Sequence, residues 1–152
     1  MTTALSPTLL NRRPFAWLRE RDIDLLICSE VHADSHLTRF LAAKVGATDA
    51  SFVSAWVSHM ETDGESDLVV VYQDRERQVG VLIENKIAAS FQPDQGARYS
   101  ERRKRWESDT DGLTAVTVLL APEDYMSRPG AEEFDEHLSY EEVAAVLRSD
   151  AD

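Results

Sequence analysis

The stretch VGVLIENKIAASFQPDQGARYSERR, residues 79–103, decides the fold that we expect for this chain. It opens with an apolar run typical of a buried strand, and this strand ends in Glu84-Asn85-Lys86. The chain then becomes polar, and the region from Pro93 to Trp106 has the pattern of a helix that turns basic. Because side chains two apart on a strand share a face, Glu84 and Lys86 should point the same way.

A second strand is expected directly before this one. Asp67 opens an almost unbroken β-branched run, residues 68–72, of the kind that is buried on both faces of a sheet. A polar turn from Asp74 to Arg77 leads back into residues 79–84, so the two strands should form a hairpin. Asp67 would then lie beside the end of its partner strand, where Glu84 is. We therefore expect two carboxylates and an amine to converge at one edge of the sheet.

The rest of the chain predicts an α/β fold around this hairpin. The order is helix, three antiparallel strands, helix, strand and helix, which gives a mixed central sheet flanked by helices. Apolar periodicity indicates helices over Phe15–Val31, Leu37–Val45, Pro93–Trp106 and beyond Ser139, and strands over Ser51–Met60, 67–72, 79–84 and Leu113–Ala121. We interpret residues 1–152 as one domain, with a loose N-terminal arm over 1–14 and an acidic segment and helix over 122–152.

Composition limits the class of protein. With 152 residues and 43% hydrophobic content, the chain is long enough for one domain with a substantial core. Its longest apolar runs are far below membrane-spanning length, and its start does not resemble an export signal. The single cysteine, Cys28, excludes an internal disulfide and a thiolate metal cluster. These features predict a soluble cytoplasmic protein with no membrane partner.

Charge is unevenly distributed along the chain. The formal net charge of -12 argues against a general nucleic-acid binder, because phosphate binding normally requires a positive surface. Five of the sixteen cations nevertheless fall between Arg98 and Arg105, whereas the last third of the chain is rich in acids. This pattern indicates separate basic and acidic faces.

The residues expected at the sheet edge have the chemistry of a metal site. Two carboxylates held close together repel each other unless a cation neutralises them. Hard oxygen ligands suit magnesium, which keeps several waters and usually takes one or two protein carboxylates. Lys86 beside a metal-bound water could orient or deprotonate that water, or stabilise charge that develops on a phosphate. The pattern therefore favours metal-assisted phosphodiester hydrolysis.

These residues resemble the PD-(D/E)XK nuclease superfamily. Asp67 and the Glu84-x-Lys86 triplet lie on either side of a hairpin turn, and Glu30 adds an acid from the first helix. The resemblance implies a restriction-endonuclease-like αβββαβ core over residues 15–121. It also implies that Asp67, Glu84 and Glu30 bind Mg²⁺ or Mn²⁺, with Lys86 as the catalytic lysine. Ser66 stands where the superfamily's proline would precede the aspartate.

The following helix resembles one branch of that superfamily. Gln95 and Tyr99 match a Gln-x-x-x-Tyr signature, with Arg98 between them. In that branch the signature contacts the active site and DNA, so the resemblance adds Gln95 and Tyr99 to the catalytic residues. Gln95, Arg98 and Tyr99, together with Arg102 and Arg103 further along the helix, are then expected to contact nucleic acid.

Each of these residues also has a plain structural interpretation. Glu84 and Lys86 could form an exposed ion pair on a strand, which contributes little to stability. Asp67 could be a turn residue, and Glu30 could lie on the exposed last turn of its helix. The arginines after Tyr99 could belong to a solvated flank of the helix.

Two hypotheses from different classes follow. The first is a magnesium-dependent nuclease that cuts DNA, with a second copy of the chain or a partner protein as candidates for delivering the substrate. The second is a non-catalytic interaction module with the same fold, or an acidic DNA mimic. The net charge favours the second, and the complete set of Asp67, Glu84 and Lys86 favours the first. The patterns do not distinguish DNA from RNA, or an endonuclease from an exonuclease.

Overall fold

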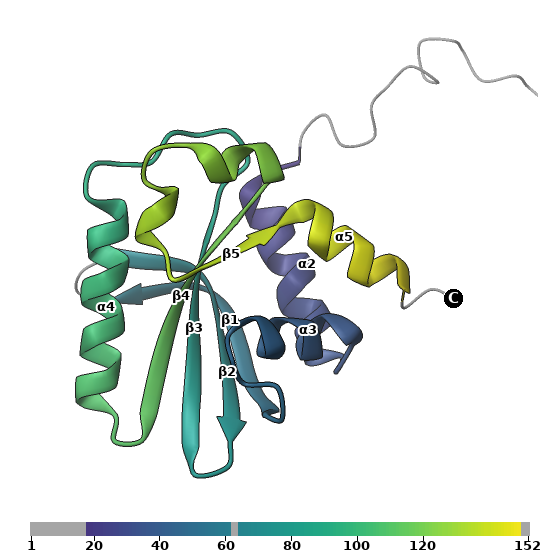
Figure 1. The fold of residues 1–152 in the computed structure, drawn as a ribbon, viewed down its shortest axis with the longest axis vertical. Coiled ribbons are helices and arrows are strands. Elements are labelled where there is room, and N and C mark those ends of the chain that lie inside the picture. The colour runs from purple at the N-terminus through teal and green to yellow at the C-terminus, as the bar shows by residue number, and fades with distance from the viewer. Residues whose placement is uncertain (1–17, 62–63, 150–152) are drawn as a thin grey trace, which may run out of the picture.

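The computed structural model describes residues 18–61 and 64–149 (Figure 1). Two helices come first, then a three-stranded meander, a long helix, and a C-terminal part with short elements and a last helix. In chain order the elements are α2 (Glu20–His32), α3 (His36–Lys44), β1 (Ser51–Glu61), β2 (Gly64–Asp74), β3 (Arg77–Asn85), α4 (Gln95–Asp109), β4 (Leu113–Ala121), the 3₁₀ helices η1 (Glu123–Ser127) and η2 (Ala131–Glu133), β5 (Glu136–Ser139) and α5 (Tyr140–Ser149).

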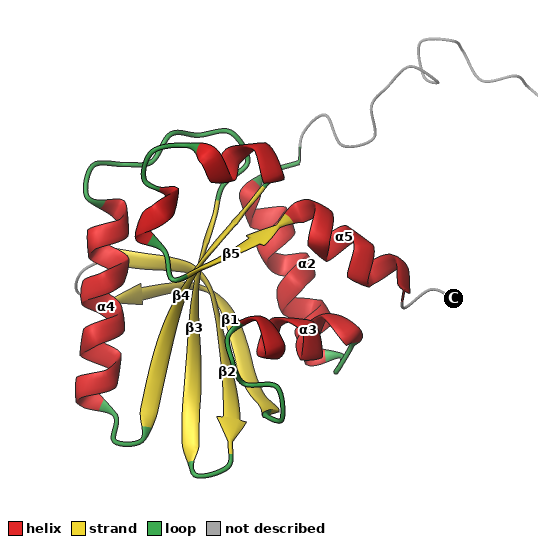
Figure 2. Cartoon of the chain, viewed as in Figure 1, coloured by secondary structure: helices red, strands yellow, loops and turns green. Residues whose placement is uncertain are grey.

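The five strands form one mixed sheet in the order β1-β2-β3-β4-β5. β1, β2 and β3 pair in antiparallel fashion, whereas β4 runs parallel to both β3 and β5. Helix α4 connects β3 to the parallel strand β4, as such a crossover requires. The predicted mixed sheet flanked by helices is therefore confirmed (Figure 2).

The sheet separates two cores. Helices α2, α3 and α5 cover one face, and α4 with η1 and η2 covers the other (Figure 1). Alternate residues of the central strands supply the two cores, because successive side chains of a strand point to opposite faces. Leu68 and Val70 pack under α2 and α3, whereas Val69 and Val71 belong to the core on the α4 side. Both faces are buried, which explains the unbroken apolar run of β2.

The predicted helices and strands agree with the structure, with a few shifts at their ends. β2 begins at Gly64 rather than at Asp67. α4 begins at Gln95 rather than at Pro93, because Asp94 has a left-handed φ of 58° that a helix cannot contain. β5 was not predicted: it has only four residues, too few for a recognisable alternation in an acidic segment.

Two helix ends follow the expected chemistry. Gly46 comes just after α3 with a positive φ of 75°, a conformation that favours glycine. At the start of α5, the Ser139 hydroxyl accepts from the Glu142 amide at 3.1 Å, and the Glu142 carboxylate accepts from the Ser139 amide at 2.8 Å. The predicted N-terminal arm, the helix start at Phe15 and the turn at Asp63 lie outside the described residues.

No helix in the described part of the chain combines the length and the apolar character that crossing a membrane requires.

Candidate active site

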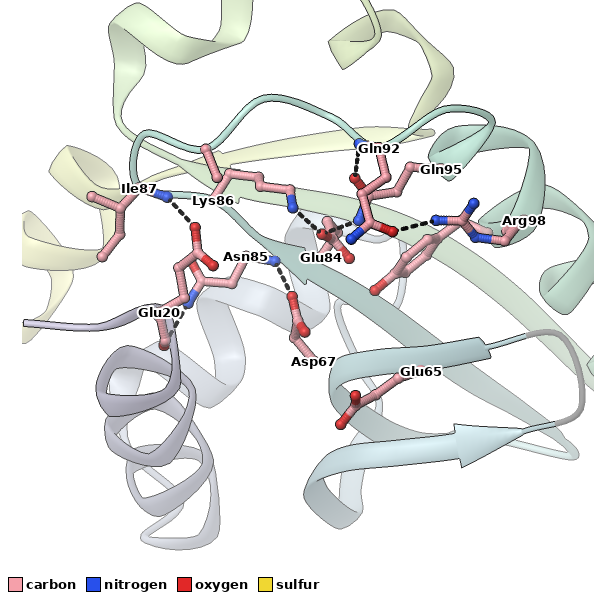
Figure 3. Close-up of polar contacts among 12 residues, drawn as sticks. Glu20, Glu65, Asp67, Glu84, Asn85, Lys86, Ile87, Gln92, Gln95 and Arg98 are labelled. Atoms are coloured by element: carbon pink, nitrogen blue, oxygen red, sulfur yellow. Dashed lines mark hydrogen bonds and ion pairs between the residues drawn. The ribbon is translucent and has the colours of Figure 1, made fainter.

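Most of the predicted site residues, but not Glu30 or Arg103, meet in a pocket at the end of β3, where β2 and α4 begin (Figure 3). The pocket has a volume of about 420 Å³ and is rich in charged groups. Its walls come from α2, β2, β3, α4 and the β3–α4 loop. The residues that line it are Glu20, Glu65, Asp67, Glu84, Lys86, Gln92, Gln95, Arg98, Tyr99 and Arg102.

Glu84 and Lys86 form a buried ion pair on the α4 side of the sheet. The Lys86 Nζ lies 2.9 Å from the Glu84 Oε1, and the two residues are only 3% and 7% exposed. Gln95 donates from its side-chain amide to the same Glu84 oxygen, and its own oxygen accepts from the Gln92 backbone amide at 3.1 Å. The alternative of a solvent-exposed ion pair is therefore wrong, and the Glu84 carboxylate has a fixed orientation.

Asp67 approaches this pair from β2. Leu68 is opposite Ile83 in the antiparallel ladder, so Asp67 comes level with the last residues of β3. Its Oδ2 accepts a hydrogen bond of 2.9 Å from the Asn85 backbone amide, which continues the ladder with a side chain. Asp67 lies inside β2, so it is not a turn residue.

The two acids repel each other within the pocket. Burial, followed by the negative charge of Glu84, raises the pKa of Asp67 from 3.8 to about 7. The pocket therefore disfavours the charged form of Asp67, chiefly because the carboxyl group is buried and then because Glu84 is close. A cation bound between Asp67 and Glu84 would relieve the repulsion and bring the carboxylate back to its charged form.

Lys86 stays charged despite its burial. Burial alone would lower the pKa of Lys86, but the neighbouring Glu84 carboxylate and the further acids of the pocket raise it above its ordinary value. An ammonium that holds its proton this firmly cannot accept one from water. Of the roles expected for Lys86, the geometry therefore favours orienting a water or stabilising charge on a phosphate over deprotonating the water.

Tyr99 and Arg102 hold α4 against the strands that carry the site. The Tyr99 hydroxyl donates to the Ile83 carbonyl at 3.1 Å, and burial raises its pKa well above the usual value. Arg102 is 1% exposed, donates to the Glu65 carbonyl at 2.9 Å and the Ser66 hydroxyl at 2.6 Å, and has its guanidinium 4.6 Å from the Tyr99 ring centroid. Arg102 thus ties α4 to β2.

The burial of Arg102, at 1% exposure, does not favour the predicted contact with nucleic acid. Arg102 follows Gln95 and Tyr99 at helical spacing, so it continues the buried face of α4 rather than an exposed one. Arg102 still lines the pocket, whereas Arg103 does not: the Arg103 guanidinium pairs with the Asp135 carboxylate at 2.5 Å. Asp135 belongs to the acidic C-terminal segment, so the basic and acidic stretches meet at this point.

Arg98 is the predicted DNA-contacting cation that stays partly exposed at the pocket. It donates to the Pro93 carbonyl at 2.7 Å and to the Gln92 side chain at 3.2 Å. These bonds hold its guanidinium at the rim, beside the Glu84–Gln95 contact (Figure 3). A phosphate that enters the pocket would therefore meet Arg98.

Helix α2 presents a different acid from the one predicted. Glu30 does not line the pocket; it lies ten residues after Glu20, which is about 15 Å along a helix. Glu20 lies at the pocket instead, and its Oε1 accepts from the Ile87 amide at 2.9 Å. The signal was the spacing of Glu20 and Asp24, which continues the buried stripe of Ile27 and Val31 toward the start of the helix.

Asp67 and Glu84 are the two pocket carboxylates that could hold a divalent ion. Within residues 18–61 and 64–149, no group of three or more His, Cys, Asp or Glu side chains is placed to hold a metal ion. Asp67 and Glu84 supply the two carboxylates that Mg²⁺ commonly takes, with waters completing its coordination. A bound cation would lower the raised pKa of Asp67, because it would offset the repulsion from Glu84.

Three comparisons with known proteins returned no match for this chain. They covered protein-family models, curated proteins and solved structures. The argument for function therefore rests on the site itself.

Proposed function

We propose that this protein is a metal-dependent nuclease that hydrolyses phosphodiester bonds of DNA. Asp67 and Glu84 would bind Mg²⁺, with Mn²⁺ as a substitute, and Lys86 would assist the attacking water. The observation that carries the proposal is the convergence of Asp67, Glu84, Lys86 and Gln95 on one pocket, from strands and a helix that are separate in the sequence.

The element order supports the resemblance to the PD-(D/E)XK superfamily. Helix α2, strands β1 to β3, helix α4 and strand β4 follow the αβββαβ order, with α3 inserted after α2. In this interpretation Asp67 and the Glu84-x-Lys86 triplet occupy the superfamily's positions on the hairpin. The Gln95–Glu84 hydrogen bond supports a role in the site for the Gln-x-x-x-Tyr helix.

The side chains of the site would have different roles in hydrolysis. Gln95 and Lys86 hold the Glu84 carboxylate, and Asn85 holds Asp67. A bound Mg²⁺ would lower the pKa of a coordinated water and polarise the phosphate. Lys86, as an ammonium, would orient that water and stabilise the negative charge that develops on the phosphate. Arg98 would bind a phosphate oxygen at the rim.

Charge makes substrate binding depend on the metal. Four acids and three cations line the pocket, so its formal charge is negative before a divalent ion binds and positive afterwards. The whole chain carries a net charge of -12, which repels a polyanion. We therefore expect DNA to bind this pocket only with a divalent ion present.

Plasmid cleavage tests the proposal. Purified protein should nick DNA with Mg²⁺ or Mn²⁺ and stop in EDTA, and Glu84→Gln and Lys86→Met should each lose at least about a hundredfold in rate. The matched controls are Glu101→Gln and Lys104→Met, because these residues form an exposed ion pair of 3.2 Å on α4. Equal rates in all four variants would show a contaminant and remove the proposal.

Two observations favour the alternative of a non-catalytic module or DNA mimic. The Glu84 carboxylate already accepts from two internal donors, and the chain is strongly acidic. Mn²⁺ binding measured by calorimetry separates the two functions. The nuclease should bind Mn²⁺ and lose this binding in Glu84→Gln. Absence of Mn²⁺ binding by the wild-type protein would favour the alternative.

A further inference from the structure

Asn85, between Glu84 and Lys86, forms hydrogen bonds with four residues at the site. It is fully buried, with 0% exposure. Its backbone amide donates to the Asp67 Oδ2 at 2.9 Å. Its side-chain Nδ2 donates to the Glu20 carbonyl and to the Asp24 Oδ1, both at 2.8 Å. Its Oδ1 accepts from the Tyr140 hydroxyl at 2.5 Å.

These bonds join elements that approach from different directions. At the end of β3, Glu84 points to the α4 face and pairs there with Lys86, so the Asn85 side chain points to the opposite face, where α2 and α5 lie (Figure 3). Asp24 is a 3% exposed residue of α2, and Tyr140 is the first residue of α5. Asn85 therefore connects α2 and α5, on one face of the sheet, to Asp67 in the pocket.

Only an amide side chain satisfies this environment. The Asn85 Nδ2 faces two oxygens and needs two N–H donors, whereas its Oδ1 faces a hydroxyl and must accept. An aspartate here would set a carboxylate against the Glu20 carbonyl and the Asp24 carboxylate. A leucine would leave the buried Asp24 and Tyr140 groups without this partner, which costs free energy.

We propose that Asn85, held by Asp24 and Tyr140, is a positioning residue that fixes the orientation of Asp67 in the pocket. This inference rests on the proposed function, because the purpose of a fixed Asp67 is to bind the divalent ion. It also assigns a role to α5, which lies outside the αβββαβ order: through Tyr140, the C-terminal helix supports the metal site. Mutation of groups that orient metal ligands in this way typically lowers metal affinity by about 10- to 100-fold.

The first test measures the Asn85–Asp67 hydrogen bond without metal. Tyr140→Phe removes one hydroxyl and keeps the ring, so it should loosen the Asn85 side chain and expose the Asn85 amide. In the metal-free protein, hydrogen exchange of this amide should accelerate about fivefold relative to the Val81 amide in the middle of β3. Because both rates are measured in the same protein, a change in global stability cancels in the ratio of the Asn85 and Val81 exchange rates.

Tyr72→Phe is the matched control. The Tyr72 hydroxyl is also buried and donates to a carbonyl, that of Thr38, at 2.9 Å, and burial raises the pKa of both phenols. Tyr72 supports α3 rather than the pocket. Its variant should lose similar global stability, while the ratio of the Asn85 and Val81 exchange rates should stay at the wild-type value.

The second test measures Mn²⁺ affinity by calorimetry. Tyr140→Phe and Asp24→Ala should each weaken Mn²⁺ binding by about tenfold. Asp24→Asn should restore most of the affinity, because its side-chain oxygen can still accept from Asn85. Tyr72→Phe should bind Mn²⁺ like the wild type.

The outcomes separate this inference from the proposed function. An unchanged exchange ratio in Tyr140→Phe would overturn the inference even if the protein binds Mn²⁺. Normal Mn²⁺ affinity in both Tyr140→Phe and Asp24→Ala would overturn it as well. If the ratio rises but the wild-type protein binds no Mn²⁺, the link from Tyr140 to Asp67 stands and the proposed function fails.

Discussion

Replacing Asp67 by asparagine should make the protein more stable at alkaline pH while abolishing its proposed activity. The pKa of Asp67 is about 7 in the folded protein against 3.8 for a free side chain, mainly because of burial and then because of Glu84. The folded state therefore binds this proton more tightly than the unfolded state. Its stabilising contribution is complete below pH 3.8 and is lost as the pH rises through about 7.

The magnitude follows from the shift. A rise from 3.8 to about 7 is roughly three pH units, and each unit corresponds to about 1.4 kcal/mol, so the upper bound is about 4 kcal/mol. Asp67 is half-buried, and screening by water lowers this value to about 2 kcal/mol. The substituted amide side chain would carry no charge at any of these pH values and could still accept from the Asn85 amide. Asp67→Asn should thus exceed the wild type in unfolding free energy by about 2 kcal/mol at pH 8 and by about zero at pH 4.

Urea unfolding followed by tryptophan fluorescence, at several pH values from 4 to 8, measures this difference. Adding Mg²⁺ at pH 8 should stabilise the wild type and leave Asp67→Asn unchanged. Asp135→Asn is a control of opposite sign. Burial would raise the pKa of Asp135, but hydrogen bonds from Thr117 and Arg103 lower it, so the stability it confers is present at neutral pH and lost on acidification. A stability difference for Asp67→Asn that does not vary with pH would refute the reasoning.

Three further substitutions test other parts of the structure. Arg102→Ala should lower the unfolding free energy by about 3 kcal/mol in urea titrations, because the guanidinium contacts two β2 oxygens and the Tyr99 ring. Arg102→Lys should restore little of this stability. A loss as small as that of the exposed Lys104→Ala would contradict this. Gly130→Ala should cost more than Gly46→Ala in the same assay: both have positive φ, but a Cβ at Gly130 would lie 2.8 Å from the Phe91 ring, whereas nothing lies within 4 Å at Gly46. Equal losses would mean that backbone strain alone decides. Arg98→Ala should reduce the slope of log affinity for DNA against log salt by about one with little change in stability, and an unchanged slope would remove Arg98 from the interface.

The contacts of the β3–α4 loop show why local sequence patterns were insufficient for the site. Tyr125 donates to the Ala89 carbonyl at 2.5 Å, and Phe91 packs on Tyr125 and Phe134. These partners come from a segment that showed only turns and acids in the sequence. They hold the loop that carries Gln92 into the pocket, and no periodicity in the loop itself indicates them.

The unexpected positions of Glu30, Arg102 and Arg103 have a common cause. Each residue has a side chain that could bind a metal ion or a phosphate. Helical spacing shows which side chains share a face of a helix, but not which face the sheet covers or which turn of the helix reaches the pocket. Packing placed Glu20 rather than Glu30 at the pocket and turned Arg102 inward against β2. Arg103 forms an ion pair with Asp135, which is 32 residues away in the sequence.

The sequence alone determined the helices, the hairpin of β2 and β3, and the approach of Asp67 to Glu84 and Lys86, because these depend on strand alternation and on short-range pairing. Tertiary structure decided the acid that α2 contributes, the burial of Arg102, and the use of Asn85 to join α2 and α5 to Asp67. These features depend on how separate elements meet across the sheet, and that contact is fixed only when both cores pack.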